Sequence, residues 1–429
     1  MQESAKESNY YRQMSDLTNY NPSQREAVTF GEGPLLVLAG PGSGKTFTIT
    51  QRILYLIHEK QIPPQKLLVI TFTREAAVSM RQRFLQISPQ HTTVNFGTFH
   101  SCFYQILLRS GRVSPGNILN EKQKKELIYP VLKKIKAHNA LSATDLPELA
   151  KNLLTAIGYY KNTGDLQSSM DRLPEEWKND FAQVYSGYEE ARKRIRGLDF
   201  DDMLKECEEL LQKDDALRIY WQNLFSYILI DEFQDINYRQ YCIVRLLAQK
   251  HKNVFAVGDD DQAIYGFRGA KPACMKQFVQ EFGAKQIILS TNYRSHQDIV
   301  EASLAVIAEN SDRFPKNLEP CEANRRHLGK MDKKNYHVRI REFSGAKEQL
   351  QFLMRQLKDR TEGETYGILF RTNLAMQSVA ASLTREGIPF SIKEHGKNIY
   401  DHFIVQDILA YLRIAQGTAA RADYLRVVN

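Results

Sequence analysis

The chain alternates between short apolar or β-branched runs and longer stretches in which apolar positions recur every three or four residues. Short apolar runs between polar or glycine-rich segments are typical of parallel strands that are covered on both faces. Such runs occur at 35–39, 67–71, 93–96, 227–230, 254–258 and 287–289. Helical patterns lie between them, so this part of the chain predicts an α/β fold built on a parallel sheet.

The region 105–196 differs from its surroundings because its pattern is helical, polar and basic. We expect it to form a helical insertion, after which the α/β domain resumes near residue 197. Positive charges gather in two places within it, at Lys122, Lys124, Lys125, Lys133, Lys134 and Lys136 and at Arg192, Lys193, Arg194 and Arg196. A solvated helix face and a contact with nucleic acid explain these charges equally well.

Composition narrows the class of protein. With 429 residues the chain is too long for one ordinary core, so two or three domains are expected. Hydrophobic residues make up 42% and no apolar run is long enough to span a membrane, which indicates a soluble, cytoplasmic protein. Five widely spaced cysteines predict neither a disulfide framework nor a zinc site. The net charge of +8 favours a polyanionic partner.

The strand expected at 35–39 runs into a glycine-rich loop that predicts a nucleotide site. The loop is Ala39-Gly40-Pro41-Gly42-Ser43-Gly44, with Ala39 in place of the first glycine of the strict pattern. Small residues let backbone N–H groups surround phosphate oxygens. Lys45 can then reach the β- and γ-phosphates, and the Thr46 hydroxyl can ligate Mg²⁺. A strand before the loop and a helix after it favour ATP binding over a structural glycine turn.

A helix is expected to begin upstream of this loop, at Asn21-Pro22, after a polar and disordered lead-in over 1–16. Gln24 lies one turn into this helix. Because an amide side chain both donates and accepts hydrogen bonds, Gln24 is a candidate to recognise adenine. A solvated helix glutamine is the alternative.

Two adjacent carboxylates, Asp231 and Glu232, follow the expected strand 227–230. Asp231 is placed to hold Mg²⁺, directly or through water, and Glu232 to orient and deprotonate the attacking water. Adjacent acids at the end of a buried strand are costly unless a cation is present. Asp235 is expected to support them from behind.

The loop after the expected strand 254–258 combines two kinds of candidate. Gln262 can sense a γ-phosphate by hydrogen bonding, whereas Tyr265, Phe267 and Arg268 can contact the bases and phosphates of a nucleic acid. The three aspartates at 259–261 form a less favoured candidate metal cluster.

Three other strand ends carry candidates of the same kinds. Arg294 follows the strand at 287–289 and is a candidate arginine finger, with Tyr293 as a candidate adenine platform. Phe72, Phe99 and His100 follow the strands at 67–71 and 93–96 and are candidates for base stacking and phosphate contact. Core packing explains a lone phenylalanine equally well.

Taken together, these motifs resemble those of the UvrD/Rep/PcrA group of superfamily 1 DNA helicases. Besides the phosphate loop, the motifs in the family's order are Thr71-Phe72-Thr73, Gly97-Thr98-Phe99-His100-Ser101, Leu198-Asp199-Phe200-Asp201-Asp202, Asp231-Glu232-Phe233-Gln234-Asp235, Gly258-Asp259-Asp260-Asp261-Gln262 and Asn292-Tyr293-Arg294-Ser295. Segments 367–373 and 407–413 are also similar to the family, and the resemblance runs from Leu17 to the last residue.

The resemblance implies two P-loop, RecA-like domains with ATP between them. Residues 17–104 plus 197–283 would form the first, and 284–429 the first part of an incomplete second domain, with strands near 338–343, 366–370 and 387–392. ATP and Mg²⁺ would be the cofactors, and single-stranded DNA and DNA junctions the partners. ATP hydrolysis would drive 3′–5′ movement on DNA in repair or replication. The residues implied in DNA contact are Phe72, Thr98, His100, Phe200, Tyr265, Phe267 and Arg268.

The sequence departs from the family at three places. Arg74-Glu75 replaces the usual Asn-Lys, and Phe267 stands where tryptophan is common. The sequence ends at Asn429, before the family's His-containing, DNA-linked motif and second arginine finger. We therefore expect a fragment of a full helicase in preference to a natural short form. Such a chain would bind ATP and Mg²⁺ but hydrolyse ATP poorly alone.

Two other functions remain compatible with these residues. One is a module that binds ATP or DNA with little turnover until the missing part or a partner completes its site. The other is a phosphoryl-transfer enzyme acting on a small molecule, which would need an acceptor pocket and would not depend on nucleic acid. The aromatic and basic residues at the strand ends argue against this second function.

Overall fold

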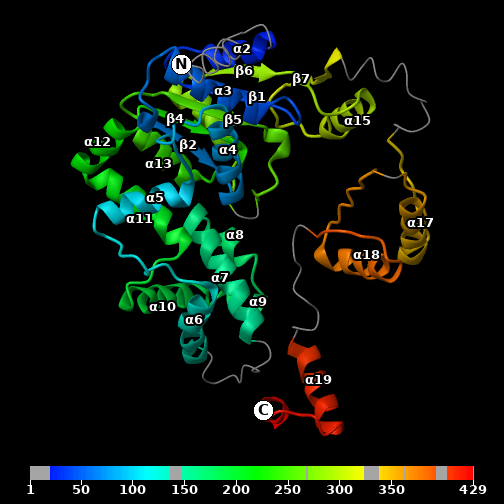
Figure 1. Cartoon of the computed structure of the whole chain (residues 1–429). Helices are drawn as coiled ribbons and strands as arrows, with labels where there is room; N and C mark the ends of the chain where they lie inside the picture. Colours follow the sequence, from blue (N-terminus) through cyan, green and yellow to red (C-terminus); the bar gives the residue numbers. More distant parts are fainter. Residues whose placement is uncertain are drawn as a thin grey trace. The chain divides into compact units, whose positions relative to one another are not determined.

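The structure is a computed structural model and describes residues 20–135, 146–266, 269–322, 338–361, 363–392 and 403–428 (Figure 1). The chain forms two compact units, Met1–Val338 and Arg339–Asn429. Within the described ranges, no helix is both long and apolar enough to cross a membrane.

A six-stranded sheet forms the centre of the first unit (Figure 1). Its strands are β1 (Leu35–Ala39), β2 (Leu67–Thr71), β3 (Asn95–Thr98), β4 (Tyr227–Ile230), β5 (Val254–Gly258) and β6 (Lys285–Leu289), in the order β3-β2-β4-β5-β1-β6. Every adjacent pair is parallel, so the carboxyl ends of all six strands meet at one edge. The predicted α/β fold with a parallel sheet is confirmed.

Helices cover both faces of the sheet, which explains why its strands are apolar at consecutive positions. Leu36 and Leu38 of β1 point into a core that includes residues of α5 (Phe99–Arg109), α11 (Phe200–Lys213), α12 (Asp215–Leu224), α13 (Tyr238–Ala248) and α14 (Ala273–Phe282). Leu35 and Val37 point the opposite way, into a core with α2 (Pro22–Thr29), α3 (Lys45–His58) and α4 (Arg74–Ile87). The sheet is therefore held rigidly between two apolar layers.

The region between α5 and α11 forms a separate group of helices in the first unit (Figure 1). These are α6 (Glu121–Ile135), α7 (Leu146–Thr163), α8 (Leu166–Met170), α9 (Glu175–Lys178) and α10 (Phe181–Arg194). They enclose a core of their own, in which Trp177, Phe181 and Tyr188 are fully buried. Helix α7 also contacts α11 and α13, and so connects the helical group to the sheet.

A buried cluster of charges reinforces this connection. Lys161 of α7 is 2% exposed, and its Nζ lies 2.7 Å from Glu189, 2.8 Å from Asp199 and 2.8 Å from Asp202. Burial alone would lower the pKa of Lys161, but the three carboxylates raise it above its ordinary value, so the side chain stays charged. The charges hold α7 and α10 against the start of α11.

The position of Arg192 differs from what the sequence predicts for the basic run 192–196, namely a solvated or nucleic-acid-binding face. Its guanidinium pairs with Glu189 and Asp202 at 2.9 Å and is 7% exposed. Arg192 therefore belongs to the interior and not to a solvated or nucleic-acid-binding face. The spacing of lysines and arginines could not reveal this, because the burial of Arg192 depends on Asp202, which comes from α11.

The domain boundary expected at residue 284 precedes β6, which pairs with β1 along its whole length. The segment after β6 contains β7 (Thr291–Asn292), α15 (Gln297–Ile307) and β8 (Glu319–Pro320), and β7 pairs in parallel with β8. Up to Val338 these residues belong to the first compact unit. This position brings the Asn292–Ser295 segment next to the glycine-rich loop.

The second unit contains α17 (Ala346–Lys358), α18 (Asn373–Arg385), α19 (Phe403–Ala415) and α20 (Arg421–Val428). The strands expected near 338–343, 366–370 and 387–392 are wrong in the part of this unit that the structure describes, which contains no strand. Ile368, Phe370 and Ile388 do pack against a small core of α17 and α18. Their backbones lack ladder partners there, and an apolar pattern alone cannot supply the hydrogen bonds of a sheet.

Candidate functional site

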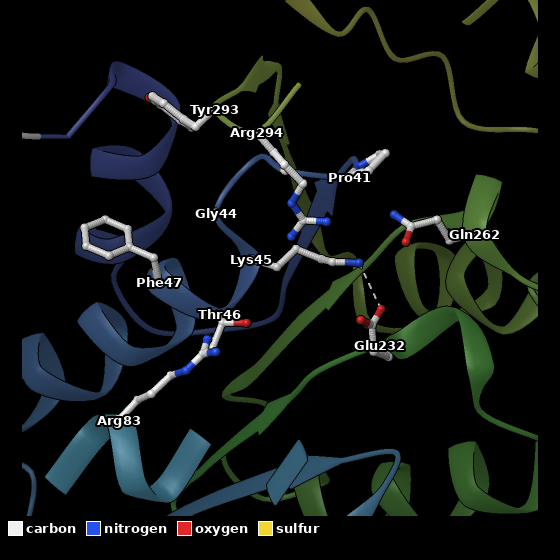
Figure 2. Close-up of a pocket in the computed structure, with 11 residues that line it drawn as sticks. Pro41, Gly44, Lys45, Thr46, Phe47, Arg83, Glu232, Gln262, Tyr293 and Arg294 are labelled. Atoms are coloured by element: carbon white, nitrogen blue, oxygen red, sulfur yellow. Dashed lines mark hydrogen bonds and ion pairs between the residues drawn. The ribbon is translucent and has the colours of Figure 1, made fainter. Parts of the chain in front are cut away.

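A pocket of about 420 Å³ lies at the carboxyl edge of the sheet (Figure 2). It is lined by Pro41, Gly42, Gly44, Lys45, Thr46, Phe47, Arg83, Glu232, Gln262, Tyr293 and Arg294. These residues come from five segments that are far apart in the sequence. The parallel topology brings most of them together, because β1, β4, β5 and β6 deliver the residues that follow them to the same edge, whereas Arg83 comes from the second half of α4.

The glycine-rich loop follows β1, whose last residue Ala39 is fully buried. Gly42 and Gly44 adopt left-handed backbone conformations, with φ of 70° and 89°, which favour glycine. The Ser43 hydroxyl donates to the Gly40 carbonyl over 2.8 Å and closes the loop. Gly44 is then the N-cap of α3, and Lys45 and Thr46 are its first residues. A helix N-terminus with this loop is a favourable environment for phosphate.

Lys45 and Glu232 meet in the centre of the pocket. The Lys45 Nζ lies 2.9 Å from Glu232 Oε2 (Figure 2), and the side chains are 13% and 36% exposed. Glu232 has a φ of 50°, which is rare for a residue with a Cβ and aims its side chain from the end of β4 into the pocket. Gln234 donates to the same Glu232 oxygen over 2.8 Å. The carboxylate is thus held between a cation and an amide.

Asp231 lies behind Glu232, 7% exposed, and accepts a hydrogen bond from the Glu232 backbone N–H over 3.0 Å. Burial, together with the neighbouring charge of Glu232, raises the pKa of Asp231 to about 6, although Lys45 acts in the opposite direction. Burial and Glu232 also raise the pKa of Asp235 to about 6. A divalent cation would favour the ionised form of such a buried carboxylate. Asp231 and the pocket-lining hydroxyl of Thr46 are the oxygen donors that Mg²⁺ prefers.

The segment after β7 docks directly onto the glycine-rich loop. Asn292 is 3% exposed, donates to the Pro41 carbonyl over 2.8 Å, and accepts from the backbone N–H groups of Arg294 and Ser295, also over 2.8 Å. The Tyr293 N–H donates to the Gly42 carbonyl over 2.9 Å. A Cβ at Gly42 would lie 2.7 Å from the Arg294 Cβ, so this close approach also requires glycine. Arg294 consequently reaches toward Lys45 (Figure 2).

Gln24 lies beside this loop but is not among the pocket-lining residues. It is 4% exposed, and its amide accepts from the Asn21 N–H over 3.3 Å and donates to the Ser43 carbonyl over 3.2 Å. The Asn21 side chain caps the predicted helix and donates to the Tyr293 hydroxyl over 2.9 Å. Gln24 therefore ties the N-terminal helix to the loop.

Sequence reasoning missed two residues of the pocket, Phe47 and Arg83. Phe47 is 43% exposed on the first turn of α3, and its ring lies 5.4 Å from that of Tyr20. Arg83 reaches the pocket from α4 (Figure 2). An exposed phenylalanine at the start of an apolar helix was a usable signal for Phe47. No sequence signal identifies Arg83, because only the packing of α4 beside α3 brings it close.

Among the candidates for nucleic-acid contact, Phe72, Thr98 and His100 lie at the ends of β2 and β3, whereas Tyr265 follows β5 and Phe200 begins α11. The Phe72 and Tyr265 rings are 4.9 Å apart, and those of His100 and Phe200 are 5.4 Å apart in an edge-to-face arrangement. Phe200 is 49% exposed, whereas Phe72, His100 and Tyr265 are partly buried. Thr98 caps α5 by accepting from the Ser101 N–H. Phe267 and Arg268 lie outside the described residues.

Two of these assignments change. Phe99 is 2% exposed and packs against Phe103, so the prediction that it stacks on bases is wrong, because helix α5 turns it into the core. His100 remains at the surface edge, but desolvation lowers its pKa. The ring is therefore neutral at pH 7, and it offers stacking and hydrogen bonding in place of a positive charge.

Comparison with known proteins identifies the family. Residues 20–283 match the UvrD/REP helicase N-terminal domain, and residues 287–429 match the UvrD-like helicase C-terminal domain. The first match covers more than half of the chain, and the two matches follow each other almost without a gap.

Individual relatives agree with this assignment. A putative ATP-dependent DNA helicase, YjcD, of Bacillus subtilis is 35% identical over 92% of this chain and 52% of its own length. The ATP-dependent DNA helicase PcrA of Staphylococcus epidermidis is 35% identical, and PcrA of Staphylococcus aureus 34%, each over 96% of this chain and 56% of its own length. The chain thus spans about half the length of these relatives. It belongs to the UvrD/REP helicase family.

Proposed function

We propose that this chain hydrolyses ATP in the pocket at the carboxyl edge of the sheet and uses the energy to move 3′–5′ on single-stranded DNA, in repair or replication. One observation carries the proposal. Four polar residues of the types that phosphoryl transfer needs converge on one pocket from four segments, namely Lys45, Glu232, Gln262 and Arg294.

Each of these residues has a distinct role in the proposed reaction. Lys45 and Arg294 neutralise charge on the β- and γ-phosphates, and the N–H groups of the glycine-rich loop cradle the phosphate oxygens. Glu232 orients the attacking water and accepts its proton. Gln262 hydrogen-bonds the γ-phosphate or the water. The exposed rings of Tyr293 and Phe47 flank the place for the purine, with Gln24 beside them.

Thr46 and Asp231 would hold Mg²⁺. Bound Mg²⁺ supplies electrostatic stabilisation of the charge that develops on the transferred phosphoryl group. The raised pKa of Asp231 agrees with this assignment, since a bound cation would offset the cost of ionising a buried acid beside Glu232.

DNA would lie over the ends of β2 and β3, where the pairs Phe72–Tyr265 and His100–Phe200 present rings to bases. Thr98 lies between them at the start of α5. Phe267 and Arg268 remain predictions from the motif alone. The same strand edge would thus bring DNA and nucleotide into contact with one rigid sheet.

The test measures ATP hydrolysis with and without a single-stranded oligonucleotide. We expect DNA to accelerate hydrolysis, and Lys45→Ala to slow it by about 100-fold or more, because one preorganised donor to the phosphates is lost. Lys60→Ala is the matched control, because Lys60 is exposed and lies two residues after the end of α3. An unchanged rate of ATP hydrolysis in Lys45→Ala would contradict the proposal that hydrolysis takes place in this pocket. ATP binding without turnover in any condition would indicate a binding module.

The direction of movement along DNA is tested separately, on single-stranded oligonucleotides that carry biotin-bound streptavidin at one end. Movement in the 3′–5′ direction displaces streptavidin from the 5′ end and leaves it on the 3′ end. The opposite preference would contradict the proposed direction while leaving the ATPase site intact.

A further expected result concerns the docking of the Arg294 segment. Asn292→Ala removes one donor and one shared acceptor at a buried position, each worth about 1 kcal/mol, so ATP affinity should fall by up to roughly 30-fold. A titration with a fluorescent ATP analogue measures this change. Asn310→Ala, at an exposed position of the same unit, should leave affinity unchanged. Equal affinities of the two variants would show that the docking contact does not organise the site.

A further inference from the structure

Three consecutive aspartates follow β5, and basic side chains of this protein bind their carboxylates. Asp259, Asp260 and Asp261 offer carboxylate oxygens within 4.8 Å of one another, an arrangement that also suits a metal ion. The Lys316 ammonium lies among them, 2.5 Å from Asp259 Oδ1 and 3.0 Å from Asp261 Oδ2, and it also pairs with Asp260. The Lys316 side chain is 0% exposed. The Lys316 ammonium thus lies where a metal ion could otherwise bind.

Neighbouring residues complete the same contact. Arg313 binds both oxygens of Asp261, over 2.8 Å and 2.6 Å, and the Phe314 N–H donates to Asp260 over 2.7 Å. Segment 313–316 is therefore anchored by charge to the loop after β5. Three buried or half-buried carboxylates with two cations leave the group close to neutral, which buried charges require.

Asp259 connects this buried lysine to the pocket by two routes. Its Oδ2 accepts from Gln262 Nε2 over 2.6 Å, while Lys316 holds the other oxygen. Its backbone N–H donates to Gln234 Oε1 over 2.9 Å, and Gln234 Nε2 donates to Glu232 over 2.8 Å. The Asp259 carboxylate thus fixes the side chain of Gln262, and the Asp259 backbone N–H positions that of Glu232 through Gln234.

The same segment also touches the other side of the pocket. Leu318 lies over the glycine-rich loop, where a Cβ on Gly40 would be 2.5 Å from its Cδ1. Residues 319–320 form β8 and pair with Thr291–Asn292, immediately before Arg294. Residues 313–320 therefore brace the Gln262 side, the loop and the Arg294 side of one pocket.

We propose that Lys316 is a positioning residue for ATP hydrolysis, which acts by holding the Asp259 carboxylate in place so that Gln262 keeps its orientation toward the γ-phosphate. The inference rests on the proposed function. Without Lys316, the buried Asp259 carboxylate would lose the cation that holds one of its oxygens, and its rotation would withdraw the acceptor from Gln262. Nucleotide binding depends on other residues and would persist.

The first test measures kinetics. Lys316→Met should lower kcat by about 10- to 100-fold, as expected for a misplaced catalytic group, and leave the Kd for a fluorescent ATP analogue within about two-fold. Lys276→Met is the matched control, because it removes a lysine that pairs with Asp312, which is 88% exposed, and should keep kcat near that of the parent protein. Lys316→Met combined with Gln262→Ala should be no slower than Gln262→Ala alone, because both changes remove one function. Multiplicative effects would overturn the proposal.

The second test needs no nucleotide. In protein labelled with nitrogen-15 at glutamine, the Gln262 side-chain NH₂ signal is assigned by its loss in Gln262→Ala. We expect this signal to move in Lys316→Met and to stay in Lys276→Met. An unchanged signal in Lys316→Met overturns the proposal, whatever the ATPase measurements show. If Lys316→Met does not fold, Lys316→Met with Asp260→Asn removes one of the carboxylates left unpaired, and the same two outcomes apply to it.

Discussion

Replacing Glu232 with glutamine should slow ATP hydrolysis by about 10²- to 10⁴-fold, the range expected when a general base is lost. The glutamine keeps the size and shape of the side chain but cannot accept the proton of the attacking water. It also removes the ion pair with Lys45, whose Nζ lies 2.9 Å from Glu232. Lys45 then becomes fully available to phosphate, so ATP affinity should be kept or increased.

Separate measurements of binding and chemistry test this expectation. Single-turnover hydrolysis of radiolabelled ATP gives the chemical step, and titration with a fluorescent ATP analogue gives the affinity. Glu281→Gln is a suitable control, since Glu281 is 33% exposed and pairs with Arg245 outside the pocket. Parallel losses of affinity and hydrolysis in Glu232→Gln would mean that Glu232 shapes the pocket and does not act as the base.

Lys161→Met should lower the free energy of unfolding by about 3–5 kcal/mol, the usual cost of removing one partner of a buried ion pair. Lys161 is 2% exposed and neutralises Glu189, Asp199 and Asp202. Methionine fills a similar volume but leaves these carboxylates without their shared cation. The helical group α6–α10 should separate from α11 more readily.

Denaturation in urea, followed by fluorescence, measures this change. The chain has two tryptophans, and Trp177 lies in the core of the helical group, whereas Trp221 lies in a core of the sheet domain. Lys178→Met is the matched control, because Lys178 pairs with a Glu175 that is 88% exposed, and should cost at most about 1 kcal/mol. Equal stabilities of the two variants would refute a structural role for the buried cluster.

The sequence alone was sufficient for most of the sheet, and it singled out most of the residues that line the pocket at its carboxyl edge. Strands β1, β2, β4 and β5 were predictable because a strand covered on both faces is apolar at nearly every position, as in Leu35–Ala39 and Tyr227–Ile230. Strand β3 is only partly buried and begins at Asn95, two residues after the expected start. The chemistry of the pocket was predictable because residues such as Lys45 and Glu232 directly follow strands. In a parallel sheet all such positions reach one edge, so local sequence determines their approximate location.

Only the tertiary structure decided which charged and aromatic residues line the pocket, which form buried ion pairs and which pack into the core. Arg83 reaches the pocket, Arg192 is buried among carboxylates, and Phe99 packs into the core. Lys316 fills an aspartate cluster more than fifty residues earlier in the chain, which pattern analysis had left as a candidate metal site. The strands expected after residue 338 have apolar patterns but no ladder partners among the described residues. In each case the outcome depends on a partner from a distant segment, and the pairing of charges, rings and backbones across space is not encoded in local spacing.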